Sequence, residues 1–177
     1  MHPKPPPPAM ASIPWESELA ARVRQAFGDQ ILEASSYNGQ NFFLCRQTAT
    51  TVILEYLKLE EDFDFLVDLT VVDYPERAER FELIYILYSF TRNERIRVKT
   101  SIADGVRPAS AVPVFRGANW LEREIFDLFG IEFSGHPNLT RILLPEEWTG
   151  HPLRKDYSIL QMDNQWVREN LGIESGQ

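Results

Sequence analysis

The sequence predicts an α+β domain of two layers, with helices on one face of a mostly antiparallel sheet. Two observations predict this fold class. Apolar residues recur with the helical period in two segments, and five further segments alternate or are apolar throughout, as strands are. Their order along the chain is α-β-β-α-β-β-β, and two helices cannot cover both faces of a five-stranded sheet. We therefore expect both helices on the same face.

The two helices are predicted from the spacing of large apolar residues. Every fourth residue from Trp15 to Phe27 is apolar, with charged residues between them, Pro14 near the first turn and Gly28 just past the end. Over residues 49–57, apolar residues follow the i, i+3, i+4 pattern of a second helix.

Five strands are predicted around these helices. They cover residues 31–37, 41–46, 63–73, 80–90 and 94–102. Asn38-Gly39, between the first two strands, is a strong signal for a hairpin turn. The fourth strand is apolar on both faces, which predicts a central strand covered on both sides. The fifth shows a basic face, which we interpret as a solvated surface that discourages edge pairing.

The chain divides into three parts. Residues 1–12 are rich in proline and are expected to form a disordered tail, ahead of the α+β domain at 13–130. Residues 131–177 carry large apolar side chains among glycines and prolines, without a regular period. A small domain would struggle to bury all of them under irregular loops, so we expect an extended arm that lies on another protein.

Composition limits the function classes. The net charge of −8 disfavours nucleic acid and anionic lipid as main partners. No apolar run approaches the roughly 20 residues of a membrane helix, and no signal peptide is recognisable, so a soluble protein of cytoplasmic type is expected. Cys45 is the only cysteine, which excludes an internal disulfide and a cysteine-ligated iron–sulfur cluster.

Residues 118–157 form the most specific stretch of the sequence. A helix is predicted over 120–129, with Asn119 as its N-cap and Gly130 as its C-cap. An apolar stripe follows one side of this helix, in agreement with a helix that packs on the domain.

The charged residues of this helix predict an ion-pair network. Glu122 and Glu124 lie in the first turns, where the helix dipole favours acids. Arg123 and Asp127 are four residues apart and share a face. We expect a buried Arg123 that pairs with two carboxylates and fixes one geometry of helix and arm.

A metal or acid–base site is the alternative interpretation of the same carboxylates. A di-metal site in a helix bundle would need Glu-x-x-His pairs on two helices, and the sequence has none. His136 and His151 stand in proline-rich loops without a second ligand cluster. We therefore predict no catalytic, cofactor-binding or metal residue. A free-standing metal-dependent hydrolase is kept as the least favoured alternative.

Several separate motifs in this stretch match one known family. They are Glu122-Arg123-Glu124 with Asp127, Phe129-Gly130-Ile131, Gly135-His136-Pro137 and the run from Pro152 to Tyr157. Together they resemble the signature of the 30-kilodalton-type subunit (the C subunit) of the proton-pumping NADH:quinone oxidoreductase, respiratory complex I. The resemblance covers roughly residues 15–157. One position departs from it, because Thr140 stands where the family carries a second basic residue.

The resemblance implies a structural subunit without its own activity. The complex uses FMN, iron–sulfur clusters and quinone to transfer electrons from NADH to quinone while translocating protons, and this chain is expected to bind none of these groups. It would be peripheral, on the cytoplasmic side of a bacterial inner membrane. Its expected partners are the 49-kilodalton-type quinone-site subunit, which the arm wraps, and neighbouring iron–sulfur subunits. The equivalent subunit of a membrane-bound hydrogenase or another quinone-reducing complex is the alternative.

The residues expected to bind partners or hold the arm all lie in this stretch. They are Trp120, Glu122, Arg123, Glu124, Asp127, His136, Arg141, Trp148, Arg154, Lys155 and Asp156. The two tryptophans are expected to be buried anchors, because aromatic residues and arginine dominate interface energies. His136 is expected to be a hydrogen-bonded loop residue, and His151 is given no role.

Overall fold

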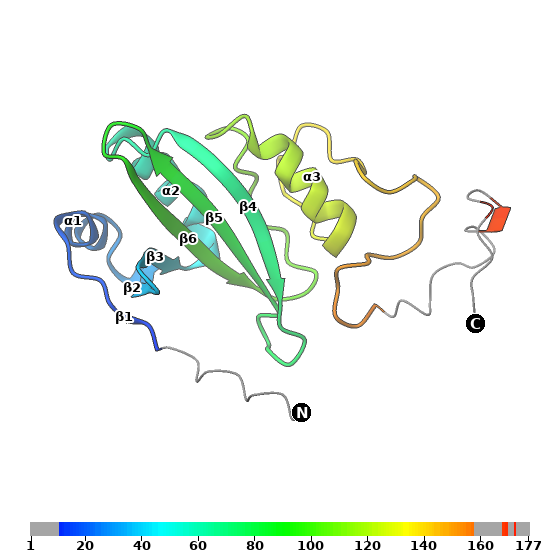
Figure 1. Cartoon of the computed structure of the whole chain (residues 1–177), viewed down its shortest axis with the longest axis horizontal. Helices are drawn as coiled ribbons and strands as arrows, with labels where there is room; N and C mark the ends of the chain where they lie inside the picture. The colour runs from blue at the N-terminus through cyan, green and yellow to red at the C-terminus, as the bar shows by residue number, and fades with distance from the viewer. Residues whose placement is uncertain (1–10, 158–167, 170–171, 173–177) are drawn as a thin grey trace, which may run out of the picture.

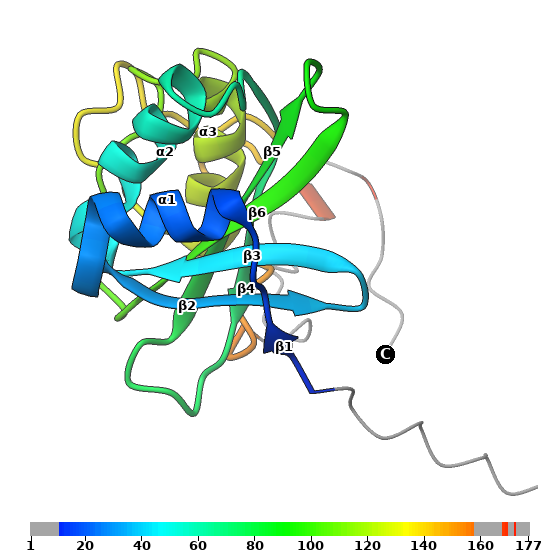
Figure 2. The same ribbon diagram turned by 90° about the vertical axis from the view of Figure 1, so that its left-hand side faces the viewer.

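The described part of the chain comprises residues 11–157, 168–169 and 172 of a computed structural model. Within it, three α-helices lie on one face of a six-stranded sheet (Figures 1 and 2). This confirms the α+β class with two layers. Most of the predicted tail at 1–12, and most of the predicted arm beyond residue 157, lie outside the described residues.

The order of the elements agrees with the predicted order, with one short strand added at the beginning. In chain order they are β1 (Ile13–Pro14), α1 (Glu18–Phe27), β2 (Ile31–Tyr37), β3 (Gln40–Cys45), α2 (Thr50–Leu59), β4 (Phe65–Asp73), β5 (Phe81–Ser89), β6 (Glu94–Ile102) and α3 (Ala118–Phe129). Two short 3-10 turns cover Gly28–Gln30 and Gln47–Ala49.

Helix α1 begins three residues later than its apolar spacing predicts. The hydroxyl of Ser17 accepts a hydrogen bond from the backbone N–H of Ala20 at 3.1 Å, which caps the helix at that point. Pro14 lies in β1, outside the helix. Trp15 is nevertheless buried, with its ring 4.9 Å from that of Phe43. The apolar spacing therefore marks the buried side of this segment but not the first turn of the helix.

The strand order in the sheet is β1-β2-β3-β6-β5-β4. Asn38 and Gly39 both have positive φ (49° and 73°), as the predicted hairpin turn between β2 and β3 requires. All pairs are antiparallel except β3 with β6. Because this parallel pair places β6 in the middle, the prediction that its basic face discourages edge pairing is wrong; β4 is the edge strand there.

The second face of the sheet has no described helix over it. Along β5, buried side chains alternate with half-exposed ones such as Ile84 and Ile86. The prediction of a strand covered on both sides is therefore wrong, because α1, α2 and α3 all lie on the other side of the sheet (Figure 2). We call the uncovered side the open face.

Helix α3 packs beside strand β4. It begins at Ala118 after Gly117, whose own φ and ψ are helical, and no side chain caps it. The prediction of Asn119 as N-cap is therefore wrong, because the preceding turn already leads into the helix. Gly130 ends the helix at φ 74° and donates its N–H to the Phe126 carbonyl, which confirms the predicted C-cap.

Candidate functional site

The last turn of helix α3 is covered by chain that follows it. A helix leaves its last four backbone carbonyls without partners inside the helix, and here each one accepts a hydrogen bond. The donors, for the carbonyls of Phe126 to Phe129 in order, are Gly130 N (2.9 Å), Arg141 Nη1 (3.2 Å) with His151 Nδ1 (2.9 Å), Leu153 N (3.0 Å) and Arg154 Nη1 (3.3 Å). We call this helix end, with the residues of 136–157 that contact it, the arm junction.

Asp127 holds the arm most directly. Its side chain is fully buried, and Oδ2 accepts hydrogen bonds from three successive backbone N–H groups, those of residues 142–144, at 2.7 to 3.0 Å. Oδ1 accepts one from Arg141 Nη1 at 2.6 Å. Burial by itself would raise the pKa of this carboxyl. The three backbone N–H groups and the guanidinium outweigh burial, and the pKa lies below its usual value.

Arg141 forms hydrogen bonds both within its own loop and with helix α3. Its Nη2 donates to the backbone carbonyls of Trp148 (3.0 Å) and Gly150 (3.3 Å), while Nη1 bonds Asp127. One guanidinium thus fixes the course of the loop over several residues. Its side chain is 16% exposed, so water competes little for these bonds.

Arg123 does not pair with the carboxylates of its own helix. It is half-buried and donates to the backbone carbonyls of Thr140 (3.1 Å) and Arg141 (3.0 Å). The predicted network of Arg123 with two carboxylates is therefore wrong. Two loop carbonyls meet the guanidinium first, and Asp127 is taken by Arg141. Arg123 still connects helix and arm, as predicted, but it does so through the backbone.

Glu122 fixes the other side of the helix, toward the domain. It is fully buried, and it accepts hydrogen bonds from the Ser110 hydroxyl (2.7 Å) and the Ala111 N–H (2.6 Å) of the preceding connector. Burial raises the pKa of this carboxyl to about 7, although both hydrogen bonds oppose the shift. No described cation pairs with it. Its position in the helix therefore reflects the connector rather than the helix dipole alone.

Two of the predicted residues point away from the domain. Glu124 is exposed. Trp120 is 61% exposed, with the Arg123 guanidinium 5.2 Å from its ring centre. Because the ring lies on the outer side of α3, Trp120 is not buried within this chain, and its role as an anchor at an interface stays a prediction. Trp148 is half-buried in the loop that Arg141 fixes.

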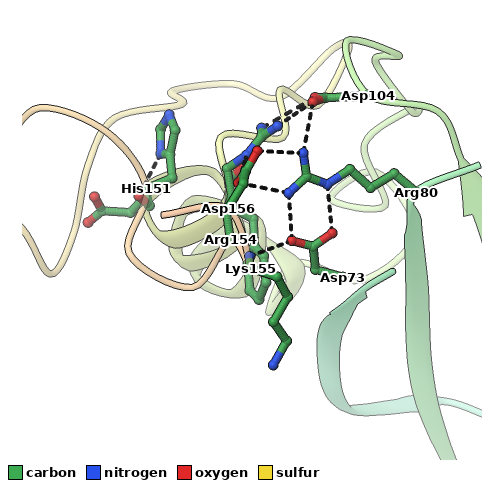
Figure 3. Close-up of polar contacts among 9 residues, drawn as sticks. Asp73, Arg80, Asp104, His151, Arg154, Lys155 and Asp156 are labelled. Carbon is green, nitrogen blue, oxygen red and sulfur yellow. Dashed lines mark hydrogen bonds and ion pairs between the residues drawn. The ribbon is translucent and has the colours of Figure 1, made fainter. Parts of the chain in front are cut away.

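The end of the described arm docks on the sheet through a cluster of charges (Figure 3). Arg80, directly before β5, binds Asp73 through two nitrogens (2.7 and 2.8 Å) and Asp156 through two (both 2.8 Å). Arg154 pairs with Asp104, and the backbone N–H of Lys155 donates to Asp73 at 2.7 Å. The side chain of Lys155 points away from the cluster.

Arg80 determines the electrostatics of this cluster. Its side chain is 12% exposed, and that of Asp73 is fully buried. Hydrogen bonds from the guanidinium are the largest influence on both Asp73 and Asp156, and they hold the pKa of each carboxyl well below its usual range. The arm is thus attached to the sheet by carboxylates that stay ionised near neutral pH.

The two histidines have structural contacts. His136 Nδ1 accepts from the Asn138 N–H (3.1 Å), which leaves Nε2 to donate to the Asn119 carbonyl (3.2 Å). This is the hydrogen-bonded loop residue that was predicted. His151, which was given no role, donates from Nδ1 to the Asp127 carbonyl. A Cβ on Gly130 would lie 2.6 Å from its ring.

Five residues of the arm junction and its docking cluster were missed or given no role in the sequence. They are Asp73, Arg80, Asp104, Ser110 and His151. Only one carried a usable signal, since Arg80 directly follows the turn that joins strands β4 and β5, across from Asp73. The other contacts join residues far apart in the chain.

The arrangement holds a chain segment in place. The buried oxygens of Glu122 and Asp127 are closed off from solvent by their donors. Among the described residues, no three histidine, cysteine or acidic side chains are grouped as a metal site would need. No helix in this part of the chain is both long and apolar enough to cross a bilayer.

Comparison with known proteins places this architecture in a class of respiratory-complex subunits. The family model described as "Respiratory-chain NADH dehydrogenase, 30 Kd subunit" matches residues 43–162. The chain belongs to this family, as its motifs predict.

Relatives of this chain carry a more particular name. Proteins named as the C subunit of NADH-quinone oxidoreductase are 36% identical in Geotalea uraniireducens, over 92% of this chain and 99% of the relative, and 44% identical in Brucella ovis, over 80% and 71%. The protein of that name from Rhodobacter capsulatus is 42% identical, over 79% and 71%.

A solved structure shares the fold. It is a chain of the membrane-bound sulfane sulfur reductase, an archaeal respiratory membrane complex, with a TM-score of 0.66 and 22% identity. The match covers 88% of this chain and 91% of that one. At this identity the likeness concerns the fold alone.

Proposed function

We propose that this chain is a structural subunit of an NADH:quinone oxidoreductase, and that its arm holds it on a neighbouring subunit. One observation carries the proposal. The arm has no helix or strand between Gly130 and Tyr157, yet Asp127, Arg141 and Arg80 fix its course by hydrogen bonds. A chain fixed in this way presents a defined surface, and its relatives are named as subunits of that oxidoreductase.

The fixed arm turns apolar side chains outward. Leu143 is 60% exposed and Leu153 50% exposed, and Trp120 is exposed on the adjacent side of α3. Asp127 bonds the backbone of Leu143, so this side chain is exposed because its own main chain is held. Exposed apolar groups on a fixed backbone favour a protein partner, since they lose little entropy on docking. We assign this surface to the 49-kilodalton-type quinone-site subunit.

The redox groups of such a complex belong to its other subunits. Cys45 is the only cysteine, it is buried, and burial raises the pKa of its thiol to about 11, which opposes thiolate ligation. We therefore propose that FMN, the iron–sulfur clusters and quinone are bound elsewhere, with iron–sulfur subunits as neighbours. On this proposal the chain is peripheral, on the cytoplasmic side of a bacterial inner membrane, and has no activity alone.

The proposal is tested by separating assembly from turnover. Arg123→Ala removes the two bonds to the loop backbone and leaves no buried carboxylate without a partner. We expect less assembled complex in the membrane, while NADH:quinone turnover for each assembled complex stays unchanged. Arg77→Ala, at an exposed arginine in the turn between β4 and β5, is the control and should leave assembly unchanged.

Two results would contradict the proposal. Normal assembly with lost turnover would mean that Arg123 acts in the reaction. A purified chain that turns over a substrate alone would favour the hydrolase alternative. The fold is shared with a chain of another respiratory membrane complex, so the fold does not distinguish the two kinds of complex. The identity of the proteins that co-purify with the chain distinguishes an NADH:quinone oxidoreductase from a hydrogenase-type complex.

A further inference from the structure

The open face of the sheet carries a row of cations along its middle strand. Arg95, Arg97 and Lys99 alternate on β6 with buried apolar residues, so all three point to the open face. Lys99 is paired with Glu82 at 3.2 Å. Within the described chain, neither Arg95 nor Arg97 has an ion-pair partner, although Arg97 is half-buried. Two guanidinium groups without carboxylate partners thus lie on the same face of one strand, on a protein of net charge −8.

A hollow lies next to these two arginines. It has a volume of about 370 Å³ and lies between the β2–β3 turn and the β5–β6 turn. Its lining residues that matter for charge are Arg95, Arg97 and Glu94. Two guanidinium groups against one carboxylate leave an excess positive charge there, so an anionic group suits the hollow best.

Exposed aromatic rings continue the same surface. Phe65 pairs with Tyr88 across strands β4 and β5, and Phe90 follows Tyr88 on the same face. The ring of Phe90 lies 5.0 Å from that of Tyr88 and 5.7 Å from that of Phe65. Phe65 is 48% exposed and Phe90 67%. Aromatic and arginine side chains are the ones enriched at the centres of protein interfaces.

The hollow is distant from the charge cluster where the end of the described arm docks. Tyr88 and Arg95 lie at the β5–β6 turn, whereas Asp73 and Arg80 lie at the β4–β5 turn, at the other end of the same strands. Figure 1 shows the arm beyond α3, on the far side of β4 from β6. The hollow at Arg95 and Arg97 therefore lies at the opposite end of these strands from the docked end of the arm.

From these contacts we propose that the hollow at Arg95 and Arg97 receives an acidic side chain of a second protein partner, whose apolar residues cover Phe65, Tyr88 and Phe90. The partner's carboxylate supplies the negative charge that this chain does not provide. The aromatic rings supply contact area beside it. The subunit is thus held at both ends of its sheet, by its arm at one end and by this acidic contact at the other.

Carbodiimide coupling in the assembled, membrane-purified complex tests the contact directly. Arg97→Lys keeps the charge and adds an amine that the reagent joins to a carboxylate in direct contact. We expect a cross-link, identified by mass spectrometry, to an aspartate or glutamate of another polypeptide. Arg77→Lys is the matched control, an exposed arginine in the β4–β5 turn, and should give no such product.

Charge reversal measures how much the contact holds. Arg95→Glu combined with Arg97→Glu should lower the amount of the partner retained after a salt wash about tenfold, as expected for a close charge pair at an interface. Arg77→Glu should change retention less than about twofold. Circular dichroism of each variant chain checks that the sheet is intact.

Four outcomes overturn the inference. The first uses a soluble acetylating reagent on the intact complex. If the amine introduced by Arg97→Lys reacts as readily as the one introduced by Arg77→Lys, no partner covers the open face. A cross-link to residues 158–177 assigns the face to this chain's own C-terminus. Binding of the chain to phosphatidylglycerol vesicles that is lost on reversal assigns it to lipid. Unchanged retention of every partner after reversal shows that the arginines hold nothing. If nothing co-purifies at all, the subunit assignment fails first, which is a separate result.

Discussion

Helix α3 carries two fully buried carboxylates whose pKa values move in opposite directions. Burial raises the pKa of Glu122 to about 7, while that of Asp127 lies below its usual value. Both side chains are 0% exposed, but Glu122 lies deeper in the protein than Asp127, so desolvation raises its pKa more.

The donors of the two carboxylates differ as well. Glu122 receives one hydroxyl and one backbone N–H, whereas Asp127 receives three backbone N–H groups and the Arg141 guanidinium. Two neutral donors do not offset the desolvation of a carboxylate, but four donors including a cation do. The two carboxylates therefore have different roles. Glu122 attaches the helix to the domain, and the ionised Asp127 attaches the arm to the helix.

Removal of Asp127 should have the largest effect. Asp127→Ala leaves Arg141 without its carboxylate and three loop N–H groups without an acceptor. We expect a loss of about 3–5 kcal/mol in the free energy of unfolding, measured by urea denaturation. Glu124→Ala, three residues earlier and exposed, should change it by less than about 0.5 kcal/mol. Equal effects of the two changes would mean that the contacts of Asp127 contribute nothing to stability.

The raised pKa of Glu122 predicts a pH dependence of the opposite sign from that of Asp127. Because the folded chain binds this proton more tightly than the unfolded chain, its stabilisation is full below about pH 4.5 and is lost as pH rises to about 7. The loss is about 3 kcal/mol.

Glu122→Gln tests this dependence. The amide cannot ionise, and it keeps both contacts, because its oxygen accepts from Ala111 N–H while its nitrogen donates to the Ser110 hydroxyl. The decline between pH 4.5 and 7 should therefore disappear from the unfolding free energy. Stabilisation from Asp127, whose pKa is lowered, should still be lost as pH falls below its usual 3.8. A decline that persists in Glu122→Gln would assign it to another group.

Substitution of Gly130 should have an intermediate effect, because the arm packs against it. Gly130→Ala introduces a Cβ at φ 74° and 2.6 Å from the His151 ring, and we expect a loss of about 2 kcal/mol in thermal or urea unfolding. Gly135→Ala has a similar φ of 80° with open space around it, so it should cost only about 1 kcal/mol. In a His151→Ala background, Gly130→Ala should cost about as much stability as Gly135→Ala. A cost that stays higher would mean that the His151 ring is not what the new Cβ meets.

The smallest predicted effect concerns the geometry of the charge cluster on the sheet. Arg80→Lys keeps the charge but cannot bind Asp73 and Asp156 with two nitrogens each, so about 1.5 kcal/mol of stability should be lost. Arg107→Lys, in an exposed pair with Glu132, should lose almost none. Equal losses in urea unfolding would mean that burial of Arg80 contributes nothing.

The elements of the fold were predictable because their signals are local. The Asn38-Gly39 turn, the C-cap at Gly130 and the apolar periods of the helices depend on residues within a few positions of one another. The start of α1 was predicted wrongly because the apolar period continues through Trp15, which is buried without being helical.

The pairing of charges was not predictable in the same way. Arg123 and Asp127 share a helix face in sequence terms, yet each bonds the loop instead of the other. Asp156 finds Arg80 across 76 residues. An exposed pair four residues apart is worth only a few tenths of a kcal/mol, so a buried partner brought in by the fold easily replaces it.

By itself, the sequence determined the helices and strands, the α+β class and the family, because periodicity, turns and motifs depend on residues that are close together in the chain. Only the tertiary structure decided which strand lies in the middle of the sheet, which carboxylate meets a cation and where the arm docks. Parallel pairing of β3 with β6 set the first, and the path of residues 136–157 over the end of α3 set the others. The physical reason is that buried charged groups pair with the polar groups nearest to them in space, and the folded backbone decides which groups are near.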